Sequence, residues 1–130
     1  MISSGIIKKA IKESKKSDLP IFKVGAVVFK SSRILGCGYN KKSPCGKINL
    51  KYRNPYDSIH AEQSAILNVK NWSKLKGSSM LVIRLTISNI LSMARPCDIC
   101  MNMIKHVGIK EIYYSNHDSE IIKENVWLLY

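Results

Sequence analysis

Two short motifs in this sequence combine residue types that bind zinc with one that moves protons. The first is His60-Ala61-Glu62, and the second, further along the chain, is Pro96-Cys97-Asp98-Ile99-Cys100. One imidazole and two thiolates supply three of the four ligands that tetrahedral zinc prefers, which leaves one position for water. Glu62 stands two residues from the histidine and is suited to accept the proton of that water. The two motifs together therefore indicate hydrolytic chemistry at a zinc ion.

A second interpretation of the same residues stays open, namely a zinc module without catalytic activity. Cys37 or Cys45 would then close the fourth coordination position. Cys37 falls in an apolar segment, where a cysteine more often packs in the core, so Cys45 is the stronger candidate of the two. Glu62 speaks against this interpretation, because a closed structural site has no use for a neighbouring carboxylate.

Length and composition indicate one domain over residues 1–130. A chain of 130 residues can build one hydrophobic core but not two. No apolar run approaches the roughly 20 residues that span a bilayer, and the N-terminus lacks the sustained apolar region of a signal peptide. With two of its four cysteines in a CxxC motif, the chain is expected in a reducing, cytoplasmic setting.

The chain is strongly basic, with 21 Lys plus Arg against 9 Asp plus Glu and a net charge of +12. Such a charge favours anionic partners, which include nucleotides, nucleic acid and acidic surfaces. Part of it lies in a long loop, residues 40–58, that leads to His60. The basic residues of this loop are Lys41, Lys42, Lys47, Lys51 and Arg53. They are suited to a 5′-phosphate or a polynucleotide backbone, and Tyr52 and Tyr56 to stacking on a base.

Hydrophobic periodicity predicts an alternation of helices and strands. Helices are expected at 3–16, 59–69 and 97–107, and strands at 24–29, 34–39, 80–87 and 111–115. The first two strands form a hairpin, and the first is apolar almost without alternation, as in a strand covered on both faces. This order predicts a three-layer α/β domain with some parallel pairing. The tail from residue 116 is ambiguous: a short helix around 119–125 is one interpretation, and the apolar segment 126–130 is expected to be buried against the sheet or against another subunit.

Five segments resemble the cytidine/deoxycytidylate deaminase superfamily, whose signature is H-x-E followed by P-C-x-x-C. The likeness runs from about Pro20 to Ser115. It covers Val24-Gly25-Ala26-Val27-Val28, Gly36-Cys37-Gly38-Tyr39-Asn40, Ser58-Ile59-His60-Ala61-Glu62, the motif from Pro96 to Cys100, and Ile109-Lys110-Glu111-Ile112-Tyr113-Tyr114. The resemblance implies a three-layer α/β/α, cytidine-deaminase-like fold with a mixed sheet of four to five strands.

The resemblance also implies a role for each motif residue. His60, Cys97 and Cys100 would bind Zn²⁺. Glu62 would pass the proton of the metal-bound water to the base while zinc hydroxide attacks C4 of a cytosine, and would then help ammonia to leave. The substrate-binding residues it implies are Asn40, which bonds the base or sugar, the Ala61 N–H, which reads the base carbonyl, and Val24 and Ala26, which line the pocket.

The sequence departs from the family pattern in two places. Residues 86–95 intervene between the third strand and the cysteine motif, where many members have almost nothing. Arg95 replaces an acidic or apolar residue before the proline. Beside two thiolates, Arg95 would hydrogen-bond to sulfur or reach a substrate phosphate; a surface arginine is an equally open interpretation.

The substrate indicated by these features is a cytosine nucleotide or nucleoside, such as dCMP, CMP or cytidine. A compact chain without an added nucleic-acid module favours a small molecule. The alternative is a deaminase of cytidine or adenosine in tRNA or single-stranded nucleic acid, which the net charge of +12 favours. As in the family, a homo-oligomer is expected.

Overall fold

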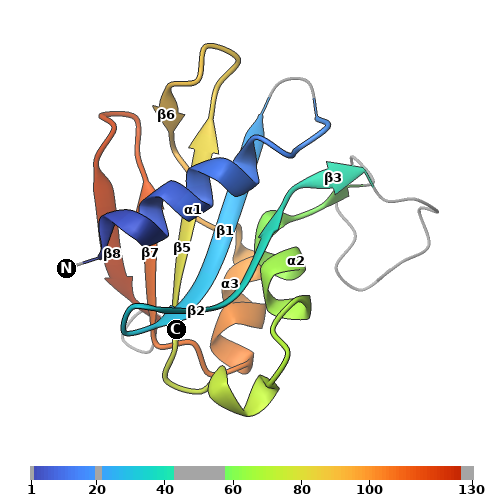
Figure 1. Cartoon of the computed structure of the whole chain (residues 1–130), viewed down its shortest axis with the longest axis vertical. Helices are drawn as coiled ribbons and strands as arrows, with labels where there is room; N and C mark the ends of the chain where they lie inside the picture. Colours follow the sequence, from blue (N-terminus) through green and yellow to red (C-terminus); the bar gives the residue numbers. More distant parts are fainter. Residues whose placement is uncertain (1, 20–21, 43–57, 127–130) are drawn as a thin grey trace.

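The structure is a computed structural model that describes residues 2–19, 22–42 and 58–126. Its main feature is one mixed sheet that lies between helices (Figure 1). The helices are α1 (Ser4–Ser14), α2 (Ala61–Leu67) and α3 (Asp98–His106), with a 3₁₀ turn at Trp72–Lys74. The strands are β1 (Lys23–Lys30), β2 (Arg33–Tyr39), β3 (Lys41–Lys42), β4 (Ser58–Ile59), β5 (Ser79–Leu85), β6 (Leu91–Ser92), β7 (Glu111–Ser115) and β8 (Ile121–Asn125).

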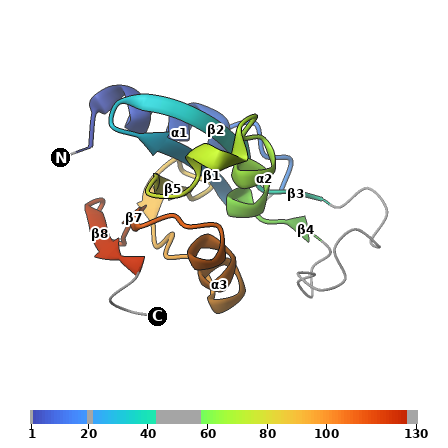
Figure 2. The ribbon, with the colours of Figure 1, turned by 90° about the horizontal axis from the view of Figure 1, so that it is seen from below.

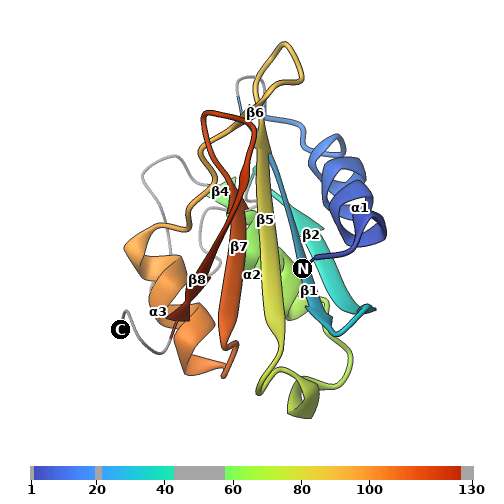
Figure 3. The ribbon, with the colours of Figure 1, turned by 90° about the vertical axis from the view of Figure 1, so that its left-hand side faces the viewer.

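The main sheet has the strand order β2-β1-β5-β7-β8, and the short β6 also pairs with β5. Only β5 and β7 are parallel, and α3 lies on the crossover between them. The other pairs of this sheet are antiparallel. Figures 2 and 3 show α1 on one side of the sheet and α3 on the other. The predicted three-layer architecture with a mixed sheet is therefore confirmed, and the sheet has six strands instead of four to five.

Strand β1 is covered on both faces, as its apolar run predicts. The side chains buried on the α1 face are Ile6, Ala10, Val27, Phe29, Leu81, Ile83 and Leu85. On the opposite face, α2 and α3 cover a larger cluster, which includes Ala26, Val28, Ala61, Ala65, Met80, Val82, Met101, Ile104 and Ile112. Alternate residues of β1 and β5 thus serve two cores, and the second core carries the two predicted zinc motifs.

The helix considered around 119–125 is wrong, because residues 121–125 form β8 and the residues before them form a turn. The Asn116 side chain accepts hydrogen bonds from the backbone N–H groups of Asp118 and Glu120, both at 2.9 Å, and Ser119 has a φ of 61°. This tight turn returns the chain antiparallel to β7. Ile121 and Ile122 then pack against opposite faces of the sheet, which suits a strand better than a helix. Val126 is fully buried, as predicted, whereas residues 127–130 lie outside the described residues.

The segment between β5 and α3 forms a hairpin instead of a simple connection. The strand predicted at 80–87 ends at Leu85, and a turn with Asn89 at a φ of 62° brings β6 back along β5. The Ser115 hydroxyl fixes this return, since it donates to the carbonyl of Ser92 at 2.7 Å. The residues that intervene before the cysteine motif are therefore held against the end of the sheet.

The long basic loop is described only at its two ends, where β3 and β4 pair antiparallel. Residues 43–57 lie outside the described residues, and with them Lys47, Lys51, Arg53, Tyr52, Tyr56 and Cys45. In the described part of the chain, no helix has both the length and the apolar character needed to cross a membrane.

Candidate active site

Both zinc motifs lie where a helix begins on the same face of the sheet. His60 is the N-cap of α2, and its backbone N–H donates to the Gln63 side chain at 3.2 Å. Cys97 is the N-cap of α3, and Cys100 lies in the first turn of that helix. Because α2 and α3 pack side by side over the second core, their first residues converge.

Helix α2 approaches strand β2 closely, and two glycines of β2 make this possible. A Cβ atom built on Gly38 would lie 2.5 Å from the backbone nitrogen of Ala65, and one on Gly36 would lie 2.7 Å from the Ala65 carbonyl oxygen. No heavy side-chain atom fits at such distances. The helix that begins with His60 and Glu62 therefore rests on the bare backbone of the sheet, which fixes its depth.

The donor atoms of His60, Cys97 and Cys100 all lie within 4.8 Å of one another. The His60 Nδ1 atom is 3.2 Å from Cys100 Sγ and 3.8 Å from Cys97 Sγ. Tetrahedral zinc, with Zn–N and Zn–S bonds of about 2.05 and 2.3 Å, would separate nitrogen from sulfur by about 3.6 Å. The observed distances bracket this value, so the three side chains fit a zinc ion.

The two cysteines differ in protonation because one hydrogen-bonds to the other. The hydrogen bonds with Cys100 and His60 lower the pKa of Cys97 to about 3. The same interaction with Cys97, together with burial, raises the pKa of Cys100 above its ordinary value. The hydrogen bond with Cys97 also raises the pKa of His60. The lowered pKa of Cys97 favours its thiolate form, which is the form that coordinates zinc.

Glu62 is buried beside these three residues, with an exposed fraction of 6%. Burial raises its pKa above the ordinary value, although the charge of His60 acts in the opposite direction. A carboxyl group with a raised pKa can both take up and release a proton near neutrality. The role of Glu62 as a proton carrier beside the metal ligands stays a prediction.

Asn40 lies where β2 ends, and its side chain bonds to the backbone at the start of β1. Its Oδ1 accepts from the Val24 N–H at 2.8 Å, and its Nδ2 donates to the Phe22 carbonyl at 3.0 Å. One N–H of the amide remains for another acceptor. The predicted contact with a base or sugar could use this N–H or the second lone pair of Oδ1, while the two hydrogen bonds to the backbone hold the edge of the sheet together.

The other residues predicted to bind substrate lie on the same face. Ala26 and Ala61 are fully buried in the second core, and Val24 packs partly buried against it. The backbone N–H of Ala61 belongs to the first turn of α2, where helical N–H groups have no partner within the helix. Ala26 can thus only close the floor of a pocket, whereas Val24 can line its wall.

The Arg95 side chain forms an ion pair with a carboxylate on β8, the last described strand of the sheet. Its Nε donates to Glu124 Oε2 at 2.8 Å and its Nη2 to Glu124 Oε1 at 3.4 Å, and its side chain is 36% exposed. The structure thus gives Arg95 a carboxylate partner on β8, a role that the sequence analysis does not anticipate. The predicted contact with sulfur or with a phosphate stays a prediction.

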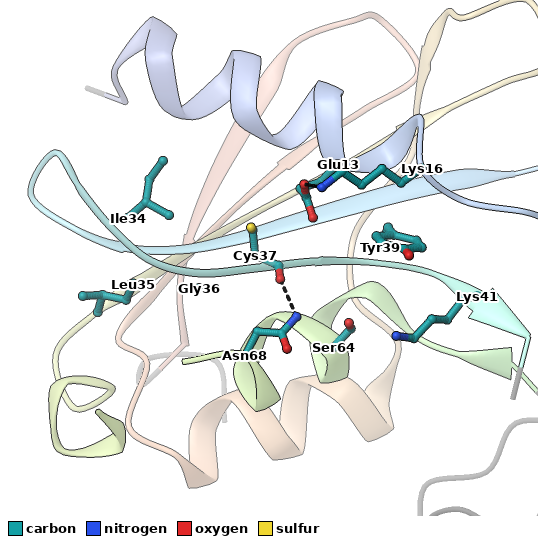
Figure 4. Close-up of a pocket in the computed structure, with 10 residues that line it drawn as sticks. All are labelled: Glu13, Lys16, Ile34, Leu35, Gly36, Cys37, Tyr39, Lys41, Ser64 and Asn68. Carbon is teal, nitrogen blue, oxygen red and sulfur yellow. Dashed lines mark hydrogen bonds and ion pairs between the residues drawn. The ribbon is translucent and has the colours of Figure 1, made fainter. Parts of the chain in front are cut away.

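Cys37 does not join the metal ligands. Its side chain packs on the α1 face of the sheet, and among the described residues only His60, Cys97 and Cys100 form a metal-binding group. Cys37 instead lines a cavity of about 590 Å³, none of whose lining residues belongs to the zinc motifs. Figure 4 shows Cys37 in this cavity with Glu13, Lys16 and Asn68.

Arg84 is a charged residue on the same face of the sheet as the zinc motifs, and the sequence analysis does not single it out. It follows Met80 and Val82 on the face of β5 that α2 and α3 cover, and it is directly opposite Val24 on β1. Its guanidinium carbon lies 3.5 Å from the centre of the Phe22 ring. The available signal was a single arginine in the otherwise apolar run of residues 80–85.

Comparison with known proteins places these features in context. Residues 3–116 match the family described as the cytidine and deoxycytidylate deaminase zinc-binding region. The deoxycytidylate deaminase of Mus musculus is 33% identical over an alignment of 128 positions, and that of Homo sapiens is 32% identical. Each alignment covers 85% of this chain and 64% of the relative, so the chain spans slightly less than two thirds of their length.

Solved structures of deaminases are also similar to this chain. The dCMP deaminase of the cyanophage S-TIM5, solved in complex with dCMP and dUMP, is 26% identical and superposes with a TM-score of 0.54. That match covers 89% of this chain and 85% of the phage protein. A cytidine deaminase from Burkholderia pseudomallei shares the fold, with a TM-score of 0.67 over 99% of this chain and 96% of that protein, at 18% identity.

Proposed function

The chain belongs to the cytidine and deoxycytidylate deaminase zinc-binding family, and from this premise we propose that it removes the exocyclic amine of a cytosine nucleotide or nucleoside. Water is the other reactant, and the products are the corresponding uracil compound and ammonia. The names of the relatives that cover 85% of the chain favour dCMP among these substrates.

The observation that carries the proposal is a buried carboxylate beside a group of three metal-binding side chains among the described residues. His60, Cys97 and Cys100 supply three donors, and Glu62 is buried next to them with a raised pKa. A purely structural zinc site would need a fourth protein ligand and no acid–base group. Zinc, when bound here, supplies Lewis acidity that makes a water in the open position acidic enough to be deprotonated near neutral pH.

The protein side chains then have distinct tasks. Glu62 accepts the proton of the attacking water, delivers it to the ring nitrogen of the base, and assists the departure of ammonia. The Ala61 N–H and the remaining N–H of Asn40 orient the base and sugar. Val24 excludes water from the side of the ring. The positions of Ala61 and Val24 in the second core, and the hydrogen bond between Asn40 and the Val24 N–H, support these assignments.

The proposal is tested by ammonia release from zinc-loaded protein incubated with cytidine, deoxycytidine, CMP, dCMP, adenosine or guanine. We expect turnover of a cytosine compound, with dCMP as the best substrate. Glu62→Gln should lower kcat by at least about 10²-fold while the protein still binds zinc, because a general acid–base group contributes on the order of 10²–10⁴. Glu120→Gln, which changes an exposed residue of the turn before β8, is the matched control. No turnover of any of these compounds, with Glu62→Gln equal to the unchanged protein, would refute a small-molecule deaminase.

A deaminase acting on nucleic acid is the second candidate, which the net charge of +12 favours. Such an enzyme would retain single-stranded polynucleotides with a steep dependence on salt concentration. Filter binding of single-stranded DNA and RNA between 50 and 300 mM salt separates the two candidates, at roughly the range over which phosphate contacts are lost. Binding of mononucleotides alone would exclude the second candidate.

A further inference from the structure

Arg84 carries a positive charge on the face of the sheet that holds the zinc motifs. Side chains of β5 alternate between the two cores, and Met80, Val82 and Arg84 share one face. On the neighbouring strands, Val24 and Ser92 are directly opposite Arg84. Because β5 runs from Ser79 to Leu85, Arg84 lies at its carboxyl end, from which the chain continues through β6 to Cys97.

The guanidinium of Arg84 is poorly satisfied by the protein. Its Nε is buried without a hydrogen-bond partner among the described residues, and its Nη1 reaches only the Met93 carbonyl at 3.4 Å. In the described part of the chain no carboxylate pairs with it, whereas Arg95 pairs with Glu124. Burial alone lowers the pKa of Arg84. Retaining a partly buried cation without a counter-ion is costly, so an anionic ligand would improve the stability of this arrangement.

The ring of Phe22 determines which side of the guanidinium a ligand can reach. The Arg84 guanidinium carbon lies 3.5 Å from the ring centre, so the aromatic ring occupies one face of the cation. The edge of an arginine presents parallel N–H donors that match a phosphate or carboxylate in a bidentate manner. Five donors with one weak protein acceptor leave enough capacity for such a ligand.

Arg84 also belongs to the group of residues that would surround the substrate sugar. Asn40 bonds to the Phe22 carbonyl and to the Val24 N–H, and these two residues contact or oppose Arg84. A nucleotide whose base lies at Glu62 and whose sugar lies at Asn40 would extend its 5′ substituent along this edge. A nucleoside in the same position would leave the guanidinium without an anion.

We propose that Arg84 is the residue that recognises the 5′-phosphate of a cytosine mononucleotide bound at the zinc site. The inference rests on the proposed function and specifies its substrate class as a nucleoside monophosphate. Arg84 takes no part in the chemical step; it selects and anchors the substrate. The preference for nucleotide over nucleoside is then a property of one side chain.

The kinetic test compares dCMP with deoxycytidine in the zinc-loaded protein and in Arg84→Gln, Arg84→Lys and Arg33→Gln. We expect Arg84→Gln to lower kcat/KM for dCMP about 10- to 100-fold, mainly through KM, and to leave deoxycytidine within about twofold, since a charge-assisted hydrogen bond contributes on that order. Arg84→Lys should recover part of the loss. Arg33→Gln is the control, because it removes the same charge at the turn between β1 and β2. Its kcat/KM values for dCMP and deoxycytidine should equal those of the unchanged protein. Zinc content and the midpoint of thermal unfolding are measured for each variant to check that it is folded.

A binding test makes the inference independent of turnover. Titration calorimetry measures the affinities of the product dUMP and of deoxyuridine, and we expect Arg84→Gln to remove the preference for dUMP. Equal losses for phosphorylated and unphosphorylated ligands would show that Arg84 only supports the fold, and would overturn the inference. Turnover of deoxycytidine without any preference for dCMP would overturn it while leaving the proposed function intact. If no cytosine compound is turned over, the proposed function fails, and the dUMP titration alone decides the role of Arg84.

Discussion

Cys97 and Cys100 show how two identical side chains acquire different properties three positions apart. Cys97 is exposed at the N-cap of α3, whereas Cys100 is fully buried in the first turn. Hydrogen bonding lowers the pKa of Cys97 to about 3 and raises that of Cys100. Zinc binding to both sulfurs therefore releases a proton from Cys100, and metal affinity should decrease as pH falls.

The composition of the ligand set is tested by removing single sulfurs. We expect Cys100→Ser to lower the zinc content of dialysed protein from about one ion per chain to a small fraction of that, because three protein ligands hold the metal. Zinc is measured by elemental analysis together with native mass spectrometry.

Cys37→Ser is the matched control and should retain its zinc, since Cys37 packs on the α1 face of the sheet. Cys45→Ser addresses the alternative of a closed, non-catalytic site. Loss of zinc from Cys45→Ser would contradict an open coordination position.

At the scale of elements, the contact between α2 and β2 sets the depth of the active site. Gly36 and Gly38 let the helix backbone rest on the strand, with no room for a Cβ atom at either position. His60 and Glu62, at the start of α2, take their position from this contact. Gly36 and Gly38, which are distant from the zinc motifs in sequence, therefore help to determine where His60 and Glu62 lie.

Gly38→Ala is expected to destabilise the protein by about 1–3 kcal/mol, as overpacking in a dense interior does. The added methyl group would meet the Ala65 nitrogen at 2.5 Å. Gly5→Ala is the matched control: its Cβ would meet only the Ser3 hydroxyl at 3.9 Å, on an exposed turn of α1. That change should stabilise by up to ~1 kcal/mol, since alanine favours helix. Chemical denaturation gives both values, and equal effects of the two substitutions would contradict the role of Gly38.

The sequence predicted most of the elements and the three residues that form the candidate metal site, whereas it did not predict the strand at 121–125. Caps and periodicity locate the helices that carry His60 and Cys97, so their convergence follows from the fold class. The turn at Asn116 depends on side-chain hydrogen bonds that periodicity does not reveal, so β8 was predicted as a helix. Without β8, nothing in the sequence indicates that Glu124 pairs with Arg95.

At the scale of the whole molecule, a net charge of +12 makes the few acidic residues important for stability. Glu13 is 3% exposed and pairs with Lys16 at 2.6 Å and with Lys9 at 3.6 Å. Burial raises its pKa, but the hydrogen bond and charge of Lys16, together with the charge of Lys9, outweigh burial and leave the pKa below its ordinary value of 4.5. The predicted homo-oligomer stays a prediction.

This depressed pKa gives Glu13 a pH-dependent contribution to stability. A carboxyl group whose pKa is lower in the folded than in the unfolded chain stabilises above its ordinary pKa, and the contribution is lost as pH falls through the folded value. We therefore expect Glu13→Gln to be less stable than the unchanged protein at pH 7, with the difference shrinking below pH 4.5, the ordinary value for this group.

Urea denaturation at several pH values between 7 and 3.5, roughly the range in which carboxylates titrate, measures this difference. Asp118→Asn, in the exposed turn before β8, is the matched loss of a negative charge and should show little change. A gap between Glu13→Gln and the unchanged protein that widens towards acid would reverse the sign of the linkage and contradict this assignment.

The ion pair between Arg95 and Glu124 joins the loop before the metal ligands to the strand that closes the sheet. Residue 124 lies beyond the matched family segment, which ends at 116. Fraying of β8 would break this ion pair, so the position of the loop before Pro96 depends in part on the pairing of β8 with β7.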